Sequence, residues 1–290
     1  MPATAPALVA GSRWVARRRR VAELRRTHPF ASEVLDFYGA LLPVQQKAFE
    51  DAAANPPPVD HLAAYVGETV MPSVVDVSLA AGPEKVRGDT FEVLERERPV
   101  TIVSRWIDGV EQVPVERFLA RASLEPVLDA LGSHATAAFP RRRDNLGCPA
   151  CGGPPQLSYF APAGEDLATG PRRLQCARCG SAWGYPRMTC PGCGESSSSK
   201  LRIFSEEGTA SGERGSVIRG LPGPPRDHRA ATFPHMRVEA CDSCRHYLLN
   251  IDLALDSQAV PEVGELAAIP LDLYARERGF TKLIPNLMGF

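Results

Sequence analysis

The sequence lacks several features that would assign it to a familiar functional class. Its 290 residues contain no run of 18 or more apolar residues, so no segment is a candidate transmembrane helix. No Gly-x-Ser-x-Gly, Walker or dinucleotide-binding fingerprint is present, and the 34 acidic residues form no recognisable catalytic pattern. We therefore expect a protein that does not insert into membranes and has no enzymatic activity of its own.

An excess of charge of one sign is also missing. Lys and Arg number 33 against 34 Asp and Glu, for a formal net charge of −1, which argues against a protein that coats nucleic acid or anionic membrane. The tract Arg17–Arg20 is similar to a twin-arginine export signal, but residues 21–26 are charged where such a signal needs an apolar run. The sequence thus predicts a soluble cytoplasmic protein, and it is compatible with a homodimer.

No cysteine lies outside a Cys-x-x-Cys motif, because all eight fall into four such motifs. These are Cys148 with Cys151, Cys176 with Cys179, Cys190 with Cys193, and Cys241 with Cys244. In a reducing cytosol, thiols at this spacing are typical of metal ligands rather than of disulfides. Two such pairs make one tetrahedral four-sulfur site, so the pattern predicts two metal ions, which sulfur ligands alone do not identify as zinc or iron.

The loop lengths indicate which motifs join. The first and second motifs are separated by 24 residues and the third and fourth by 47, whereas only 10 separate the second from the third. Since a metal-binding ribbon needs room for a β-hairpin between its two turns, we pair the first motif with the second and the third with the fourth. The closed four-sulfur geometry leaves no open position for a substrate, which favours structural over catalytic metal ions.

The residue that follows each Cys-x-x-Cys motif determines how easily the turn of that motif closes. A glycine there supplies the positive φ that closes the turn without steric cost, and three motifs have one, in Gly152, Gly180 and Gly194. The fourth motif has Arg245 instead. His246, two residues beyond Cys244, is an alternative ligand at that site. Four thiolates around a divalent ion carry a local charge near −2, which we expect turn N–H groups and nearby arginines to offset, namely Arg142, Arg173, Arg178 and Arg187.

The apolar pattern predicts an α+β protein with an irregular α-helical N-terminal domain. We expect a helix capped by Ser32 that ends before the prolines at 56–58, with a kink at Pro43, and further helices around 60–65, 71–81 and 89–98. Another helical pattern opens at Pro114, runs to Ala122 and continues over 125–138. The arginines of 17–20 are interpreted either as a solvated helix face or mobile arm, or as a contact for an acidic partner.

Short β-prone runs alternate with the cysteine turns. Strands are expected at 156–160, 172–175, 201–204, 237–239 and 247–253, with a long excursion over 205–234 and helix again after Asp252, interrupted at Pro270. The predicted organisation is a helical domain at 1–140, two tandem rubredoxin-like or zinc-ribbon-like modules at 141–188 and 189–255, and a C-terminal helix and tail at 256–290.

The segments CPACGG, LQCARCGSAW, RMTCPGCG and EACDSCRHYLLNID, in this order after a helical half, resemble the FdhE-type formate dehydrogenase accessory proteins. The specific motifs cover residues 140–280. The resemblance implies a cytoplasmic maturation factor that binds the catalytic subunit of respiratory formate dehydrogenase before export. It also implies two rubredoxin-like sites, one formed by Cys148, Cys151, Cys176 and Cys179 and the other by Cys190, Cys193, Cys241 and Cys244, and it favours iron over zinc.

Two other functions stay open at this point. A zinc-ribbon protein that binds nucleic acid is supported by the local basic patch at Arg141–Arg143, although the near-neutral charge argues against it. A rubredoxin-like electron carrier is the second alternative, because iron bound by four sulfurs can cycle between two oxidation states.

Overall fold

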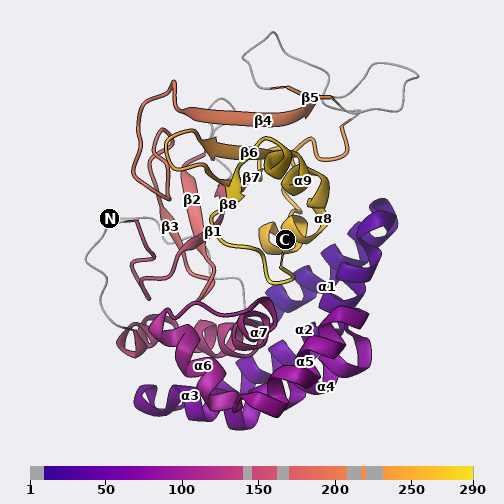
Figure 1. Ribbon diagram of the computed structural model, residues 1–290, viewed down its shortest axis with the longest axis vertical. Coiled ribbons are helices and arrows are strands. Elements are labelled where there is room, and N and C mark those ends of the chain that lie inside the picture. Colours follow the sequence, from indigo (N-terminus) through magenta and orange to yellow (C-terminus); the bar gives the residue numbers. More distant parts are fainter. Residues whose placement is uncertain (1–9, 140–145, 162–169, 208–216, 220–230, 290) are drawn as a thin grey trace. The chain divides into compact units, whose positions relative to one another are not determined.

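The protein is described by a computed structural model that covers residues 10–139, 146–161, 170–207, 217–219 and 231–289. The chain divides into two compact units, and each is described by itself. The first comprises the described part of Met1–Pro140 together with Leu287–Gly289, and the second comprises the described part of Arg141–Asn286. The first unit is helical and the second carries a β-sheet with two helices (Figure 1), which confirms the predicted α+β class.

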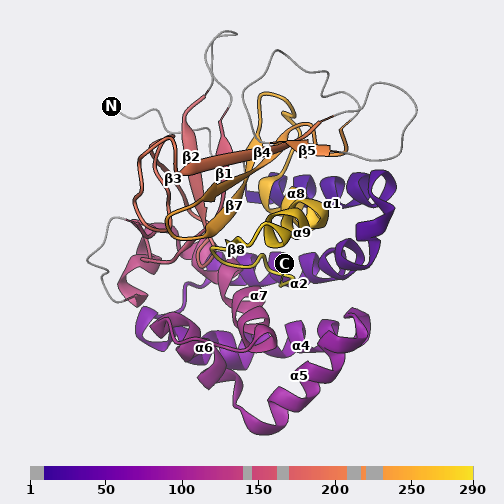
Figure 2. The same cartoon turned by 45° about the horizontal axis from the view of Figure 1, so that its top comes forward.

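The helical unit is organised around its last long helix. Its helices are α1 (Ala10–Thr27), α2 (Ser32–Ala54), α3 (Leu62–Tyr65), α4 (Met71–Ala81), α5 (Glu84–Arg96), α6 (Pro99–Asp108) and α7 (Pro114–Leu131). A π-helical turn, Val66–Val70, joins α3 to α4. Helix α7 packs against α2, α4, α5 and α6, and most of its side chains are buried, while α4 and α5 lie side by side in both views (Figure 1, Figure 2). None of the described helices has the length and hydropathy that a membrane span requires.

Helix α2 follows the prediction at both ends. It begins at Ser32 and ends at Ala54, before the proline run, and its apolar stripe, which includes Tyr38 and Leu41, is buried. The predicted cap is wrong, because Ala31 occupies the capping position and no side chain caps the helix. The helix continues through Pro43, whose missing N–H removes only one backbone hydrogen bond from a long, well-packed helix.

Two prolines further along the chain lie within helices. Pro99 follows the end of α5, as the predicted boundary at 98 requires, and it begins the unpredicted helix α6, because a proline at the first helical turn has no N–H that needs a partner. That helix ends at Gly109, whose φ of 74° closes the turn. Pro126 lies inside α7, in agreement with a pattern that continues from 114–122 into 125–138, but the α-helix ends at Leu131 and Gly132–Ala138 forms a 3₁₀ turn.

The arginine tract belongs to α1 and is only half solvated. Arg18 and Arg19 are exposed, but Arg17 and Arg20 are buried. The guanidinium of Arg17 lies 4.8 Å from the ring centre of Trp14, and the Arg20 side chain donates to Glu23 at 3.0 Å. The expectation of a solvated face or mobile arm is therefore wrong for two of the four arginines, whose apolar stems pack in the interior of the helical unit.

The second unit contains one mixed sheet. Its strands are β1 (Pro155–Phe160), β2 (Arg172–Cys176), β3 (Ala182–Gly184), β4 (Leu201–Glu207), β5 (Val217–Arg219), β6 (Met236–Cys241), β7 (His246–Asp252) and β8 (Thr281–Lys282). Their order is β3-β2-β1-β7-β6-β4-β5, with β8 also paired to β7. The β1–β7 and β7–β8 pairs are parallel and the others are antiparallel.

The sheet is continuous across both predicted metal-binding modules. Residues 141–188 contribute β1 to β3 and residues 189–255 contribute β4 to β7, and the parallel pairing of β1 with β7 joins the two sets. The predicted excursion over 205–234 contains the end of β4 and all of β5, which pair with each other. The remainder of that loop, 208–216 and 220–230, lies outside the described residues, as does the predicted boundary segment 140–143.

Two helices cover one face of this sheet. They are α8 (Pro261–Ala267) and α9 (Ile269–Glu277), and the break between them agrees with the interruption predicted at Pro270. The ring of Phe204 on β4 lies 5.6 Å from that of Tyr274 on α9, and Met236 on β6 lies beside Gly264 on α8. Both helices accordingly lie next to the middle of the sheet in both views (Figure 1, Figure 2).

A charged cluster is enclosed between the sheet and these helices. The Nζ atom of Lys282 lies 2.7 Å from Glu265 Oε1 and 3.0 Å from Asp272 Oδ1, and all three side chains are almost fully buried. Tyr247 donates to Asp272 at 2.8 Å, and Gln156 donates to Glu265. Burial raises the pKa of Glu265, while the ammonium of Lys282 opposes that rise. One lysine thus compensates two carboxylates that water does not reach.

We predict that Lys282→Met destabilises the second unit by about 3–5 kcal/mol, because it leaves two buried carboxylates without a counter-charge. Urea unfolding followed by circular dichroism measures this. The control is Lys85→Met, because Lys85 is exposed and forms an ion pair with Asp89 one turn away on the helix surface. Its cost should stay below about 0.5 kcal/mol. Equal costs for the two variants would show that the buried cluster contributes nothing specific.

Candidate metal centres

The structure gathers the eight cysteines into two groups of four. The first group is Cys148, Cys151, Cys176 and Cys179, and the second is Cys190, Cys193, Cys241 and Cys244, with the sulfurs of each group within 4.8 Å of one another. This is the combination that the loop lengths predict. His246 is not part of the second group, which four sulfurs already complete, and it begins strand β7 instead.

All four motifs share one turn geometry. The residue after each motif donates its backbone N–H to the carbonyl of the motif's first cysteine, at 2.8 Å for Gly152, 3.1 Å for Gly180, 2.9 Å for Gly194 and 2.9 Å for Arg245. Each of these residues has a positive φ, between 60° and 78°. The same turn therefore presents both sulfurs of every motif to one point, whether the closing residue is glycine or arginine.

The sulfur spacing fits a tetrahedral metal site. Four sulfurs at the ~2.3 Å metal–sulfur distance of such a site stand about 3.8 Å apart. In the first group, Cys148 Sγ lies 3.8 Å from Cys179 Sγ, and the corresponding distance from Cys151 to Cys176 is 3.4 Å. A disulfide needs about 2.05 Å, so these thiols are not bonded to each other.

The second group has the same spacing. Its two distances between motifs are 3.7 Å, from Cys190 Sγ to Cys244 Sγ, and 3.8 Å, from Cys193 Sγ to Cys241 Sγ. Both groups therefore leave room for one cation at the centre of four sulfurs. The donor set is compatible with zinc and with iron, because both accept four thiolates in this geometry.

Backbone groups complete the surroundings of the sulfurs. Arg178 N donates to Cys176 Sγ at 3.3 Å and Gly192 N donates to Cys190 Sγ at 3.4 Å. A Cβ at Gly153 would lie 2.8 Å from Cys176 Sγ and 3.2 Å from Cys151 Sγ, so only glycine lets the chain pass this close to the first group. The backbone N–H groups of Arg178 and Gly192 partly neutralise a negatively charged four-thiolate site.

The arginines expected to offset the cluster charge behave differently from one another. Arg178 lies at the first group, where its side chain donates to the carbonyl of Cys151 at 3.1 Å. Arg173 donates to Ala182 O and Arg187 to Gly170 O, so neither bonds directly to a sulfur turn through these contacts. Arg142 lies outside the described residues.

The two groups differ in their access to solvent. All four cysteines of the first group are buried, whereas in the second group Cys193 is exposed and Cys244 is half-buried. Burial raises the pKa of Cys176 and of Cys190. Burial also raises the pKa of Cys244, and the hydrogen bond with the Cys193 thiol adds to this rise, which brings that pKa to about 11. A cation must displace the protons that such thiols hold, so metal binding releases protons.

Arg245 has a second function that the sequence does not reveal. Its guanidinium donates to the carbonyls of Arg278 at 2.8 Å and Gly279 at 3.1 Å, and it lies 4.0 Å from the ring centre of Phe280. The side chain therefore ties the fourth turn to the end of α9. These contacts offset the cost of a positive φ at a residue with a Cβ. The only sequence signal was the arginine at a position that otherwise holds glycine.

We predict that Arg245→Ala is less stable than Arg245→Gly by about 1 kcal/mol. Both variants lose the contacts with the end of α9, but only alanine keeps the steric cost of the left-handed turn. Urea unfolding of the two metal-loaded variants measures the difference. If alanine proves as stable as glycine, the turn does not require the conformation described above.

We also predict that metal leaves the second group first when the loaded protein meets an excess of chelator. Exposed sulfur at Cys193 lets a chelator approach the cation, whereas the first group is enclosed. Release followed with a chromogenic chelator should show two phases of one equivalent each. Cys193→Ser should remove the fast phase and the matched variant Cys148→Ser the slow phase, each destabilising its own part of the sheet. A single phase, or the opposite assignment, would contradict the difference in access.

Comparison with known proteins agrees with this geometry. A family model described as "FdhE, C-terminal domain" matches residues 225–288. A "Protein FdhE homolog" from Aquifex aeolicus is 27% identical over 206 residues, which cover 71% of this chain and 63% of that protein. Another from Pseudomonas aeruginosa is 28% identical over 224 residues, covering 74% and 65% respectively. The matched region thus spans slightly less than two thirds of either relative.

The fold has a solved counterpart. The crystal structure of the FdhE protein from Pseudomonas aeruginosa superposes with a TM-score of 0.60 at 22% sequence identity, and the match covers 95% of this chain and 94% of that one. At this identity the superposition establishes the fold alone. The family model, the sequence relatives and the shared fold together confirm the resemblance to the FdhE family that the cysteine motifs indicated.

Proposed function

We propose that this protein is a formation factor for formate dehydrogenase. In this role it binds the catalytic subunit of the respiratory enzyme in the cytoplasm, before export, and catalyses no reaction itself. The observation that carries the proposal is the pair of four-thiol groups in one sheet, on a chain that resembles FdhE proteins along most of its length. Small β-modules of this kind depend on bound metal for their shape and offer rigid loops to a partner.

We propose further that the eight cysteines hold two metal ions, with iron favoured and zinc as the alternative. The supporting observations are the sulfur–sulfur distances of 3.4–3.8 Å and the glycine that admits the backbone beside the first group. Bound metal would supply a rigid cross-link between the turns. Metal analysis with a visible spectrum on protein purified without oxygen identifies the ion, because ferric iron in four-thiolate coordination is red and zinc is colourless.

The two groups suit different tasks within this function. The first, enclosed on all sides, is suited to holding β1, β2 and β3 together. The second, with Cys193 exposed, can respond to the redox state of its surroundings or to contact with the client. The same exposure is what a rubredoxin-like electron carrier would need, so reversible one-electron chemistry confined to the second site would favour that alternative.

We predict that deleting the gene in its host abolishes respiratory formate oxidation and that the wild-type gene restores it. A Cys190→Ser variant should restore little activity, because loss of one sulfur disrupts the exposed site, whereas the surface variant Lys85→Met should restore it fully. Formate-dependent dye reduction by membranes measures the outcome. Affinity-tagged protein should also retain the catalytic subunit from the cytosolic fraction.

Two results would discard this proposal. One is full formate oxidation in the deletion strain, and the other is a tagged protein that never retains the subunit. If the tagged protein instead retained nucleic acid in a salt-sensitive manner, the zinc-ribbon alternative would replace it.

A further inference from the structure

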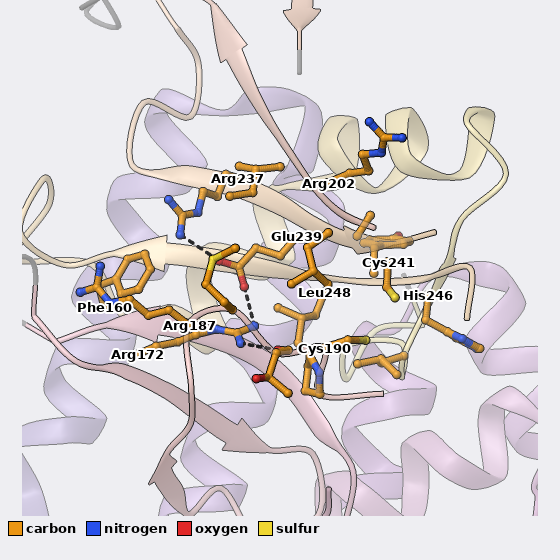
Figure 3. Close-up of a pocket in the computed structure, with 18 of the residues that line it drawn as sticks. Phe160, Arg172, Arg187, Cys190, Arg202, Arg237, Glu239, Cys241, His246 and Leu248 are labelled. Carbon is orange, nitrogen blue, oxygen red and sulfur yellow. Dashed lines mark hydrogen bonds and ion pairs between the residues drawn. The ribbon is translucent and has the colours of Figure 1, made fainter. Parts of the chain in front are cut away.

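A pocket opens on the face of the sheet opposite α8 and α9. Its volume is about 330 Å³, at the lower end of the roughly 300–1,000 Å³ typical of ligand sites. Ile203 on β4, Glu239 on β6 and Leu248 on β7 form its floor, and successive residues of these strands point to the opposite, helix-covered face. Residues 187–191, which lead into the third cysteine motif and begin it, line another side of the pocket, and Arg187 and Cys190 are labelled in Figure 3.

The floor carries a charged network in which positive groups outnumber negative ones. Arg172 donates to Glu239 Oε2 at 2.6 Å, and Arg237 donates to Glu239 Oε1 at 2.9 Å. Figure 3 shows both guanidinium groups converging on this one carboxylate. Ser158 also donates to Glu239, at 3.1 Å, but serine is neutral. Two cations therefore share a single anion. The whole lining holds four arginines, Arg172, Arg187, Arg202 and Arg237, against the two carboxylates of Glu239 and Asp252, so positive charge is in excess.

The guanidinium groups also have unused donors. Arg172 is only 3% exposed, and its Nε atom is buried with no hydrogen-bond partner among the described residues. The Nε atom of Arg237 is in the same condition. The Arg237 side chain as a whole is 30% exposed, so it is the cation that a ligand can reach, and an anionic oxygen is the acceptor that a guanidinium binds best. The chemistry of the floor thus favours a carboxylate ligand.

The rim of the pocket is apolar. Met188 on one wall is 52% exposed and Ile203 on the floor is 49% exposed, although both are large hydrophobic side chains. The ring of Phe160 is shielded by Arg187 and Arg237, each 4.6 Å from its centre. A small hydrophilic anion would leave Met188 and Ile203 in water, whereas an acidic residue between apolar neighbours would cover them. Methionine at such a rim adapts to ligands of different shape.

We propose that this pocket binds an acidic side chain, together with its apolar neighbours, from a segment of a partner protein. The carboxylate contacts the cationic floor at Arg237, the buried Arg172 adds its positive charge beneath, and the flanking apolar side chains cover Met188 and Ile203. The wall that bears Met188 continues into Cys190, so a bound segment would lie beside the second cysteine group. The site is defined by chemistry and not by the identity of the partner, so its failure would leave the proposed function intact.

The test uses two peptide probes on the full-length, metal-loaded protein. They are N-acetyl-Leu-Glu-Leu-amide and its neutral counterpart N-acetyl-Leu-Gln-Leu-amide, titrated by calorimetry and by NMR of the methionine methyl groups. The acidic peptide should bind at least about tenfold more tightly, and its advantage should shrink as salt is added. It should also shift the methyl signal of Met188. Equal affinities, or no binding of either peptide at millimolar concentration, would overturn the proposal.

Variants separate the two halves of the pocket. Arg237→Met should abolish the advantage of the acidic peptide, whereas Arg173→Met, on the opposite face of β2, should preserve it. Met188→Ser and Ile203→Ser should weaken both peptides by similar factors and leave the ratio between them unchanged. Both positions are exposed, so these two variants test the site even if Arg237→Met fails to fold. Thermal unfolding and metal content provide the check on folding, and binding unaffected by all three pocket variants would refute the assignment.

Discussion

The parallel pairing of β1 with β7 is the interaction on which the second unit depends. It joins Leu157–Phe160 to Leu249–Asp252, segments about 90 residues apart, and places both in the middle of one sheet. Parallel strands need long connections and pair slowly. The entropy of closing a large loop is lost before the contacts between the strands can stabilise the pair. Once formed, the pair unites the three strands β1 to β3 with the four strands β4 to β7 in a single sheet.

The four-thiol groups complement that pairing at the ends of the strands. Cys176 ends β2 and Cys241 ends β6, so each group begins where the ladder of backbone hydrogen bonds stops. A cation bound by both turns would cross-link segments that lie beyond this ladder. The first group is buried and stabilises the sheet, whereas the second group is partly exposed to solvent.

The two faces of the sheet use opposite chemistry. The face under α8 and α9 buries apolar side chains around a compensated cluster of Lys282, Glu265 and Asp272. The other face carries Arg172, Arg237 and Glu239 where a sheet built only for stability would carry apolar residues. Buried ion pairs are weak contributors to stability, and here they lie beside a pocket into which the partly exposed Arg237 opens. This is why the pocket, and not the charged cluster under the helices, is the surface that we assign to a partner.

The sequence by itself determined the features that depend on neighbouring residues. Cysteine spacing, the glycine after each of three motifs and the loop lengths were enough to place the eight thiols in two groups, and apolar periodicity located α2 and five of the strands. Tertiary structure alone decided what depends on distant contacts. It paired β1 with β7 and brought Arg172 and Arg237 to one carboxylate. The free energy of packing outweighs local conformational preference at those positions. A short stretch of sequence does not show which distant segment packs against it.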